Sequence, residues 1–567
     1  MASYPYQQTA DSGSRLGFYP RYDDPASPRP SAQMSLYDDQ KGFLQPIAGG
    51  SPYPPQPYGQ QRSYFDDDNA PARFAGQTKQ GRGNTPFFKR KKWLIPIVVM
   101  LVLAAAAGVV AVLMLTHRSS SENSKVSQNN NESNSHGSTR SGAQPTGTSS
   151  AVTPTATVTP LPRYNWLDPN NVAYGVNVGN WLVIERWLDE DWFTSLCPDC
   201  VDEWNLAAHL GPNAIPTLQA HYNSFIKESD IDTIKSMGMN MIRVTLGYWA
   251  VIDTPGEPFV NAGQLDQLRK LMEWCHARQI YITISMHGLP GSQSGDQSTG
   301  RVKSWDVGGA AWFTAQNQAR SDQVIQVLAT WITQQQPYSS VIASVLPVNE
   351  PKQTVSDADS QEVTARQDIV QAFYVRSYKT LSNIGMVMMI HPGYLDGQNP
   401  KPWGPFISQN NMDPNLIVWE THPYPGYFPL KYDPDVILET VCNYAQLHQD
   451  IQVPVFFGEF STLSGIKSSA FLQQYWNTQV AAYSQSAGST FWNWKAMNST
   501  NPDKALNSQN MTRYDFQFLM NQGIVQKPAA GQSTKQFVTS LSNNACTNQR
   551  KKRALHDRNG GRLARLF

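Results

Sequence analysis

Eight short apolar runs, each followed by a loop and a helical pattern, constrain the fold of this chain more than any other feature. Such alternation is typical of repeated βα units, and nearly continuous apolar runs indicate parallel strands covered on both faces. The runs lie at 174–178, 241–245, 280–286, 341–348, 386–390, 416–419, 453–457 and 489–492. A span of 163–546 fits a barrel with loop insertions. We therefore predict an α/β domain over 163–546, a (β/α)8 TIM barrel.

The segments around this domain have a different composition. Residues 1–88 are rich in Pro, Tyr, Gln, Gly and Asp and poor in aliphatic residues, so they bury too little apolar surface to offset the entropy of ordering. Residues 119–162 are rich in Ser, Thr and Asn, which is typical of an extended stalk. The tail at 547–567 is basic and predicted to be disordered.

An uncharged run at 93–115 separates the N-terminal tail from the stalk. A helix of this length, at ~1.5 Å per residue, crosses a ~30 Å hydrocarbon core. Four basic residues at 89–92 precede it, so the positive-inside rule predicts a cytoplasmic tail at 1–88. We expect 89–118 to be an uncleaved signal-anchor of a single-pass type II plasma membrane protein, with the barrel extracellular and facing the cell wall. Three sequons would then be available for glycosylation: Asn131, Asn498 and Asn510.

Charge and cysteine content narrow the partners further. The chain has 45 Lys and Arg against 44 Asp and Glu, without a basic cluster on any motif of the barrel, so no nucleic-acid partner is expected. Five cysteines in a secretory context predict disulfides with one thiol left over, and Cys442 with Cys546 is the first expected pair. Cys197 and Cys200 lie in a C-P-D-C loop suited to a local bridge, and Cys275 is expected to be a buried thiol. No cysteine or histidine cluster has zinc spacing, so no metal site is predicted.

Polar residues follow the apolar runs at the positions where barrel enzymes build their sites, the C-terminal ends of the strands. Only His391, after the fifth run, is interpreted by itself as a satisfied polar residue. The others, in chain order, are Arg243, His287, Asn349, Glu350, His422, Tyr424, Glu459 and Trp494.

Two of these residues have the chemistry to break a glycosidic bond, which needs a proton for the leaving oxygen and a partner for the oxocarbenium-like carbon. Glu350 lies in V-L-P-V-N-E-P, where Pro351 ends the strand, and Glu459 lies in V-F-F-G-E-F. The amide of Asn349 suits a sugar 2-hydroxyl. Arg243 beside Glu459 would favour its ionised form, and a nearby carboxylate would favour the protonated form of Glu350.

These motifs give the chain a resemblance to the fungal exo-β-1,3-glucanases of glycoside hydrolase family 5. The resemblance covers 163–546. Besides N-E-P and G-E-F, the motifs are V-N-V-G-N-W-L-V-I-E at 176–185, R-V-T-L-G-Y-W-A at 243–250, H-G-L-P-G-S-Q at 287–293, H-P-Y at 422–424 and F-W-N-W-K at 491–495.

The resemblance implies a cofactor-free retaining enzyme, a glucan 1,3-β-glucosidase that releases glucose from β-1,3-glucan in cell-wall remodelling. It implies Glu350 as acid/base and Glu459 as nucleophile. The remaining roles it implies are Arg243 and Tyr424 holding the nucleophile, Glu185, His287, Asn349 and His422 binding the sugar, Trp494 as the platform beneath it, and Tyr427 as a wall for the outgoing chain.

The chain also departs from the family pattern. Met286 precedes the histidine where the family usually has Asp, and Asp296-Gln297 stand where an aromatic residue grips the outgoing chain. Endo action, β-1,6 specificity and transglycosylation therefore stay open as alternatives. A glucan-binding ectodomain without turnover is a further alternative. The presence of both Glu350 and Glu459 argues against it. A serine hydrolase built on His287 would need a G-x-S-x-G motif, which the region after the anchor lacks.

Overall fold

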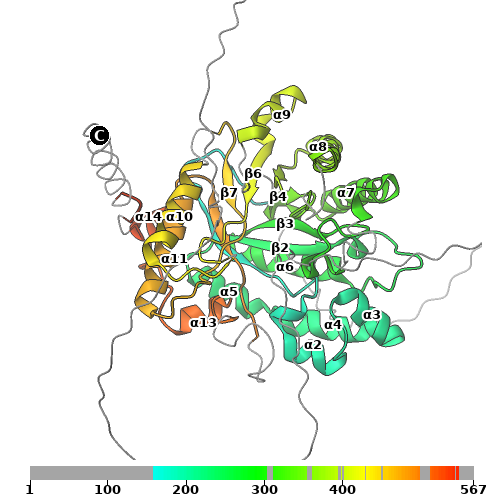
Figure 1. The fold of residues 1–567 in the computed structure, drawn as a ribbon, viewed down its shortest axis with the longest axis horizontal. Coiled ribbons are helices and arrows are strands. Elements are labelled where there is room, and N and C mark those ends of the chain that lie inside the picture. The colour runs from blue at the N-terminus through cyan, green and yellow to red at the C-terminus, as the bar shows by residue number, and fades with distance from the viewer. Residues whose placement is uncertain are drawn as a thin grey trace, which may run out of the picture. The chain divides into compact units, whose positions relative to one another are not determined.

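The computed structural model describes residues 158–302, 311–353, 360–393, 398, 401–427, 429–447, 451–497, 511–542 and 545–547. Within them, parallel strands close into a barrel in chain order, with β8 paired to β1. Figure 1 shows strands at the centre of the domain with helices around them. The strands are β1 (Ala173–Asn177), β2 (Met241–Gly247), β3 (Tyr281–Gly288), β4 (Ile342–Leu346), β5 (Met388–Ile390), β6 (Ile417–Thr421), β7 (Val455–Phe457) and β8 (Gly488–Phe491). Each predicted apolar run overlaps one of them, which confirms the predicted barrel.

The strands are apolar because both of their faces are covered. All their residues except Tyr281 are buried. Because successive side chains of a strand alternate, one set packs beneath the helices and the other points into the barrel. Small and apolar residues such as Ala173 and Met241 fill the inward-facing set near the N-terminal ends, where Trp166 packs with them and donates to the Ala343 carbonyl at 3.1 Å. The polar inward-facing residues lie at the opposite end of the barrel, near the C-terminal ends of the strands.

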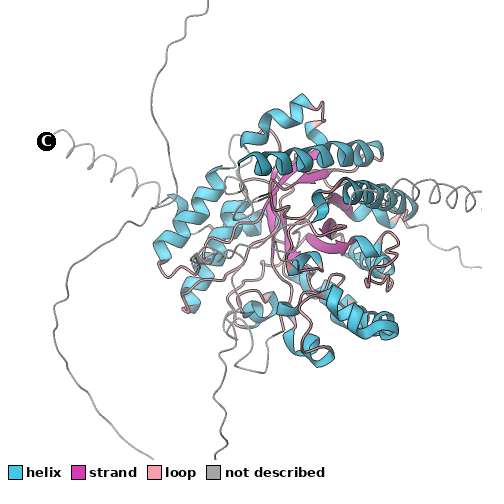
Figure 2. Ribbon diagram, turned by 45° about the vertical axis from the view of Figure 1, so that its right-hand side comes forward, coloured by secondary structure: helices cyan, strands magenta, loops and turns pink. Residues whose placement is uncertain are grey.

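Helices surround the strands (Figure 2). Those that follow or connect the strands are α5 (Glu228–Ser236), α6 (Gln264–Arg278), α7 (Ala315–Gln334), α8 (Ser360–Asn383), α9 (Gly404–Gln409), α10 (Pro434–Leu447) and α11 (Ser469–Tyr483). Among the described residues after β8 there are two short helices, α13 (Phe516–Asn521) and α14 (Thr534–Ser540). Their buried faces, such as Leu268, Leu271 and Cys275 of α6, are spaced three or four residues apart and pack on the outer face of the barrel.

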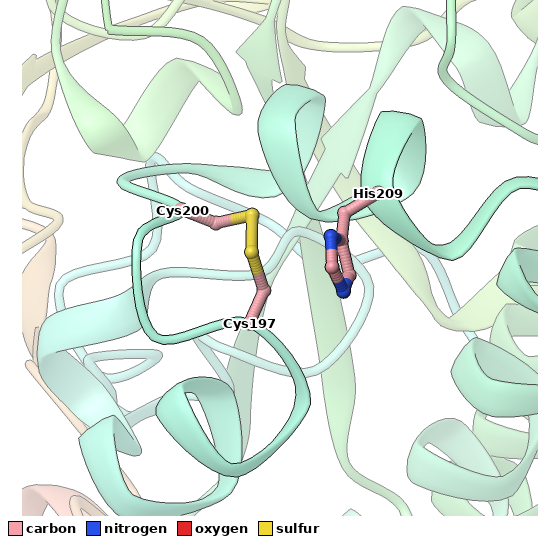
Figure 3. A group of neighbouring side chains, drawn as sticks. All are labelled: Cys197, Cys200 and His209. Carbon is pink, nitrogen blue, oxygen red and sulfur yellow. A yellow bond between two sulfur atoms is a disulfide. The ribbon is translucent and has the colours of Figure 1, made fainter.

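An insertion between β1 and β2 holds three further helices, α2 (Glu190–Leu196), α3 (Glu203–Leu210) and α4 (Ala214–Phe225), grouped together in Figure 1. A disulfide between Cys197 and Cys200 closes the turn between α2 and α3, next to the ring of His209 (Figure 3). The predicted local bridge is therefore confirmed.

The other cysteines also follow the prediction. Cys442 of α10 is bonded to Cys546, 104 residues later, so the segment after α14 is tied back to the barrel. Cys275 is an unbonded and buried thiol.

Several predictions concern parts of the chain outside the described residues. They are the tail at 1–88, the anchor at 89–118, nearly all of the stalk, the basic tail, and the sequons at Asn131, Asn498 and Asn510. In the described part of the chain, no helix combines the length and the apolar character that a bilayer span requires.

Candidate active site

Arg243, on β2, is the centre of the polar network at the C-terminal end of the barrel. Its side chain is buried, and its three nitrogens donate hydrogen bonds to acceptors on or just after several strands. Nε donates to Glu420 Oε1 at 2.7 Å, Nη1 to Glu459 Oε1 at 2.9 Å, and Nη2 to Asn349 Oδ1 at 2.8 Å. Asn177 and Ser285 accept from it at 3.0 and 3.1 Å. A buried guanidinium with this many acceptors has one orientation.

Glu459 follows β7 and points into the barrel mouth. One carboxylate oxygen accepts from Arg243, and the other accepts from the Tyr424 hydroxyl at 2.8 Å. Burial raises the pKa of Glu459, and the positive charges of His422 and Arg243 oppose that rise. Both oxygens are therefore oriented by donors, as a nucleophile requires.

Glu350 follows Asn349 at the C-terminal end of the barrel and is more accessible than Glu459. Its side chain is 15% exposed, against 6% for Glu459. Its backbone has φ +41°, a left-handed conformation that is strained for a residue with a side chain and is found most often at functional sites. His422 Nδ1 lies 2.6 Å from Glu350 Oε1. The accessible carboxyl is thus the one beside an imidazole.

His287, Asn349 and Glu185 border the same site. His287 Nε2 lies 3.2 Å from Arg243 Nη1 and 3.5 Å from Glu459 Oε1. Burial and the charge of Arg243 lower its pKa well below the usual range, so its imidazole is neutral. Glu185 accepts from Trp187 Nε1 at 2.9 Å, and burial, with the nearby glutamates, raises its pKa to about 8. This shift favours the protonated carboxyl, which can both accept and donate a hydrogen bond.

The position of Trp494 differs from the prediction that it forms the sugar platform. Its side chain has no exposed surface and stacks on Phe516, with ring centroids 5.7 Å apart. The physical reason is that β8 ends at Phe491, so the alternation of faces no longer applies to Trp494. Trp492 borders the site instead: its ring is nearly parallel to that of His287, with centroids 5.5 Å apart. Gly179 leaves room for this indole, because a Cβ there would lie 2.7 Å from it.

Tyr427 lies on the same side as Trp492. Both belong to a small cluster of apolar residues above the barrel that also includes Leu188 and Tyr514. Tyr427 is half-buried, so part of its surface is accessible. Trp187, which the sequence reasoning missed, packs on the same cluster and is held by Glu185.

Glu420 is the most important residue that the sequence reasoning missed. It is fully buried on β6, and its Oε1 atom lies 2.7 Å from Arg243 Nε and 3.1 Å from His422 Nε2. The pattern contained a signal for it, because Glu420 stands two residues before His422 and shares its face of the strand. The same period of two places Ser285 with His287.

Two groups of described side chains have metal-ligand atoms close together: Cys197, Cys200 and His209, and Glu350, His391 and His422. In the first, the sulfurs are bonded to each other, so neither is a thiolate ligand. In the second, the glutamates around His422 raise its pKa to about 9 despite burial, and Arg243 Nη2 lies 3.4 Å from its ring. A protonated imidazole beside a guanidinium disfavours a cation there. Neither group fits a metal.

Comparisons with known proteins agree with this geometry. The model of the cellulase family, glycosyl hydrolase family 5, matches residues 207–498. The chain is similar to "Probable glucan 1,3-beta-glucosidase A" of Aspergillus fumigatus, 29% identical over 305 residues that cover 53% of this chain and 67% of the relative. It is also similar to "Glucan 1,3-beta-glucosidase 1" of Schizosaccharomyces pombe, 34% identical over 226 residues that cover 39% and 52%. The crystal structure of rutinosidase from Aspergillus niger shares the fold, with a TM-score of 0.56 and 20% identity over 64% of this chain and 100% of that chain.

Proposed function

The chain belongs to glycosyl hydrolase family 5, and from that premise we propose that it is a retaining β-glucan hydrolase, a glucan 1,3-β-glucosidase with Glu459 as nucleophile and Glu350 as acid/base. The relatives named above carry this activity in their names. The linkage preference of this chain is part of the proposal.

The observation that carries the proposal is the position of His422 between the two carboxyl groups. Its Nδ1 atom lies 2.6 Å from Glu350 Oε1 and 3.7 Å from Glu459 Oε1. These two oxygens are therefore no farther apart than the two distances combined, which is less than the ~6.5–9.5 Å separation typical of inverting enzymes. This bound applies to one pair of oxygens, and it is compatible with the retaining spacing of ~5–5.5 Å between carboxyl groups, at which one carboxylate attacks the anomeric carbon itself.

The roles follow from the surroundings of each carboxyl. Glu459, oriented by Arg243 and Tyr424, attacks the anomeric carbon while Glu350 gives its proton to the departing glycosidic oxygen. In the second step Glu350 takes a proton from water, whose oxygen displaces Glu459 and regenerates both groups. Asn349, held by Arg243, is placed for the sugar 2-hydroxyl, and Trp492 takes the platform role in place of Trp494.

The test is product analysis with the purified full-length protein on laminarin, a β-1,3-glucan, against pustulan, a β-1,6-glucan. We expect glucose as the first product from laminarin, released in the β configuration by NMR. An α-configured first product would overturn the retaining mechanism. Faster turnover of pustulan would overturn the linkage, and oligosaccharides as first products would replace exo with endo action.

The location is part of the same proposal. We infer a type II plasma membrane protein whose barrel faces the cell wall, supported by the uncharged run at 93–115 and the basic residues at 89–92. A tethered hydrolase of this kind would act on insoluble wall glucan within reach of its stalk.

A further inference from the structure

One buried anion links the surroundings of both catalytic carboxyls. Glu420 Oε1 is within hydrogen-bond distance of Arg243 Nε and His422 Nε2, at 2.7 and 3.1 Å. Arg243 Nη1 in turn donates to Glu459 Oε1 at 2.9 Å, and His422 Nδ1 lies 2.6 Å from Glu350 Oε1. Glu420 itself is fully buried.

The geometry assigns a role to each ring nitrogen of His422. A carboxylate oxygen only accepts, and Glu420 is ionised because the positive charges of Arg243 and His422 outweigh burial and lower its pKa. Nε2 must therefore donate to Glu420. The other neighbour of Nε2, Arg243 Nη2, lies farther away at 3.4 Å and has Asn349 Oδ1 as its acceptor at 2.8 Å. The Nδ1 atom is left to share a proton with Glu350.

The chain beside the nucleophile is adapted to this anion. Gly458 directly precedes Glu459, and a Cβ at that position would lie 2.0 Å from Glu420 Oε1. No side chain larger than hydrogen fits there unless Glu420 moves. The glycine of the G-E-F motif is thus explained by the carboxylate of a neighbouring strand.

We propose that Glu420 is a positioning residue that keeps a proton on His422 Nε2 and holds Arg243 against Glu459, and that it thereby sets the charge balance between the two catalytic carboxyls. The proposal rests on the retaining function proposed above. Glu420 touches no reacting atom; it acts through Arg243 and His422, much as the aspartate of a serine-hydrolase triad acts through its histidine.

The experiment compares Glu420→Gln, Glu420→Asp and Glu257→Gln by the pH dependence of kcat/KM on an aryl β-glucoside. Glu420→Gln removes a negative charge near several acids, so both limbs of the profile move to lower pH by roughly one unit, and the rate falls about 10–100-fold. Glu420→Asp keeps the charge but shortens the side chain, so the rate falls while the limbs stay. The control, Glu257, also pairs with an arginine, Arg320 at 2.8 Å, outside this network, and its variant keeps rate and limbs.

A rate loss in Glu420→Gln without movement of the limbs would show a merely structural role and overturn the proposal. If the limbs of the pH profile moved as far in Glu420→Asp as in Glu420→Gln, the negative charge of Glu420 would not be the cause of the shift, and the proposal would be overturned. Nitrogen-15 NMR of histidine-labelled full-length protein gives a readout independent of activity: Nε2 of His422 is protonated in the wild type and loses this fixed state in Glu420→Gln. A wild type with His422 protonated only on Nδ1 overturns the proposal, whereas failure to cleave β-glucosides with retention overturns the proposed function alone.

Discussion

At the scale of single residues, the two glutamates have different surroundings, which match the two roles proposed for them. Glu459 is held by Arg243 and Tyr424, whereas Glu350 faces His422 and is the more exposed of the two. A carboxylate held by two donors suits attack on carbon. A carboxyl beside a proton-sharing imidazole suits the transfer of a proton.

Replacement of each glutamate separates the two roles. Glu459→Ala should lower kcat by on the order of 10⁴-fold or more and prevent formation of a glycosyl-enzyme, and azide should restore turnover with inverted stereochemistry. Glu350→Ala should slow substrates with poor leaving groups by roughly 10²–10⁴-fold but activated aryl glucosides far less, because only the former need a proton. Steady-state kinetics and mass spectrometry of the trapped enzyme check this. Substantial activity in Glu459→Ala would contradict the mechanism.

The two tryptophans of the F-W-N-W-K motif give a second comparison. Trp492→Ala should lower kcat/KM by roughly tenfold or more, since 1.4 kcal/mol of lost sugar contact has that effect. Trp494→Ala should instead lower the free energy of unfolding by ~3–5 kcal/mol, because it empties a core site against Phe516, with KM near the wild-type value. Kinetics and denaturant unfolding of both variants measure this. A larger KM effect at Trp494 would restore the original assignment.

At the scale of elements, the strand ends decide which side chains meet. Arg243 and Glu459 are 216 residues apart in sequence, and Glu350 and His422 are 72 apart, yet parallel pairing brings all four to one end of the barrel. A disulfide fixes the segment after β8 to the barrel. After β8 the chain passes through α13 and α14 and is bonded back to α10 by Cys442–Cys546.

Removal of this disulfide should cost more stability than removal of the local one. In the chain-entropy model a sequence separation of 104 corresponds to ~4–5 kcal/mol, and the separation of 3 between Cys197 and Cys200 to ~2 kcal/mol. Denaturant unfolding of the two double Cys→Ser variants compares these values directly. An equal or smaller loss for Cys442→Ser with Cys546→Ser would show that the long connection does not stabilise the barrel.

At the scale of the whole molecule, the proposed topology places tail and barrel on opposite sides of a membrane. In sealed microsomes the barrel should resist added protease, whereas residues 1–88 should be digested, because the basic residues at 89–92 keep the tail cytoplasmic. Asn131, Asn498 and Asn510 should then carry lumenal glycans that endoglycosidase removes. Detergent-permeabilised microsomes serve as the control. Digestion of the barrel with survival of the tail would reverse the topology.

The sequence by itself determined the barrel, because its eight apolar runs are local patterns set by burial on both faces of each strand. It also singled out the two glutamates as the candidate carboxyl pair, because residue type and strand-end position are informative without coordinates. The predicted pairing of Cys442 with Cys546 is present in the structure. Only the tertiary structure decided which residues surround and orient the two glutamates. Glu420 and Asn177 meet Arg243 across strands, and Trp492 rather than Trp494 reaches the site because the chain turns after Phe491. Contacts between distant segments depend on register and strand ends, which local patterns fix only to within a few residues.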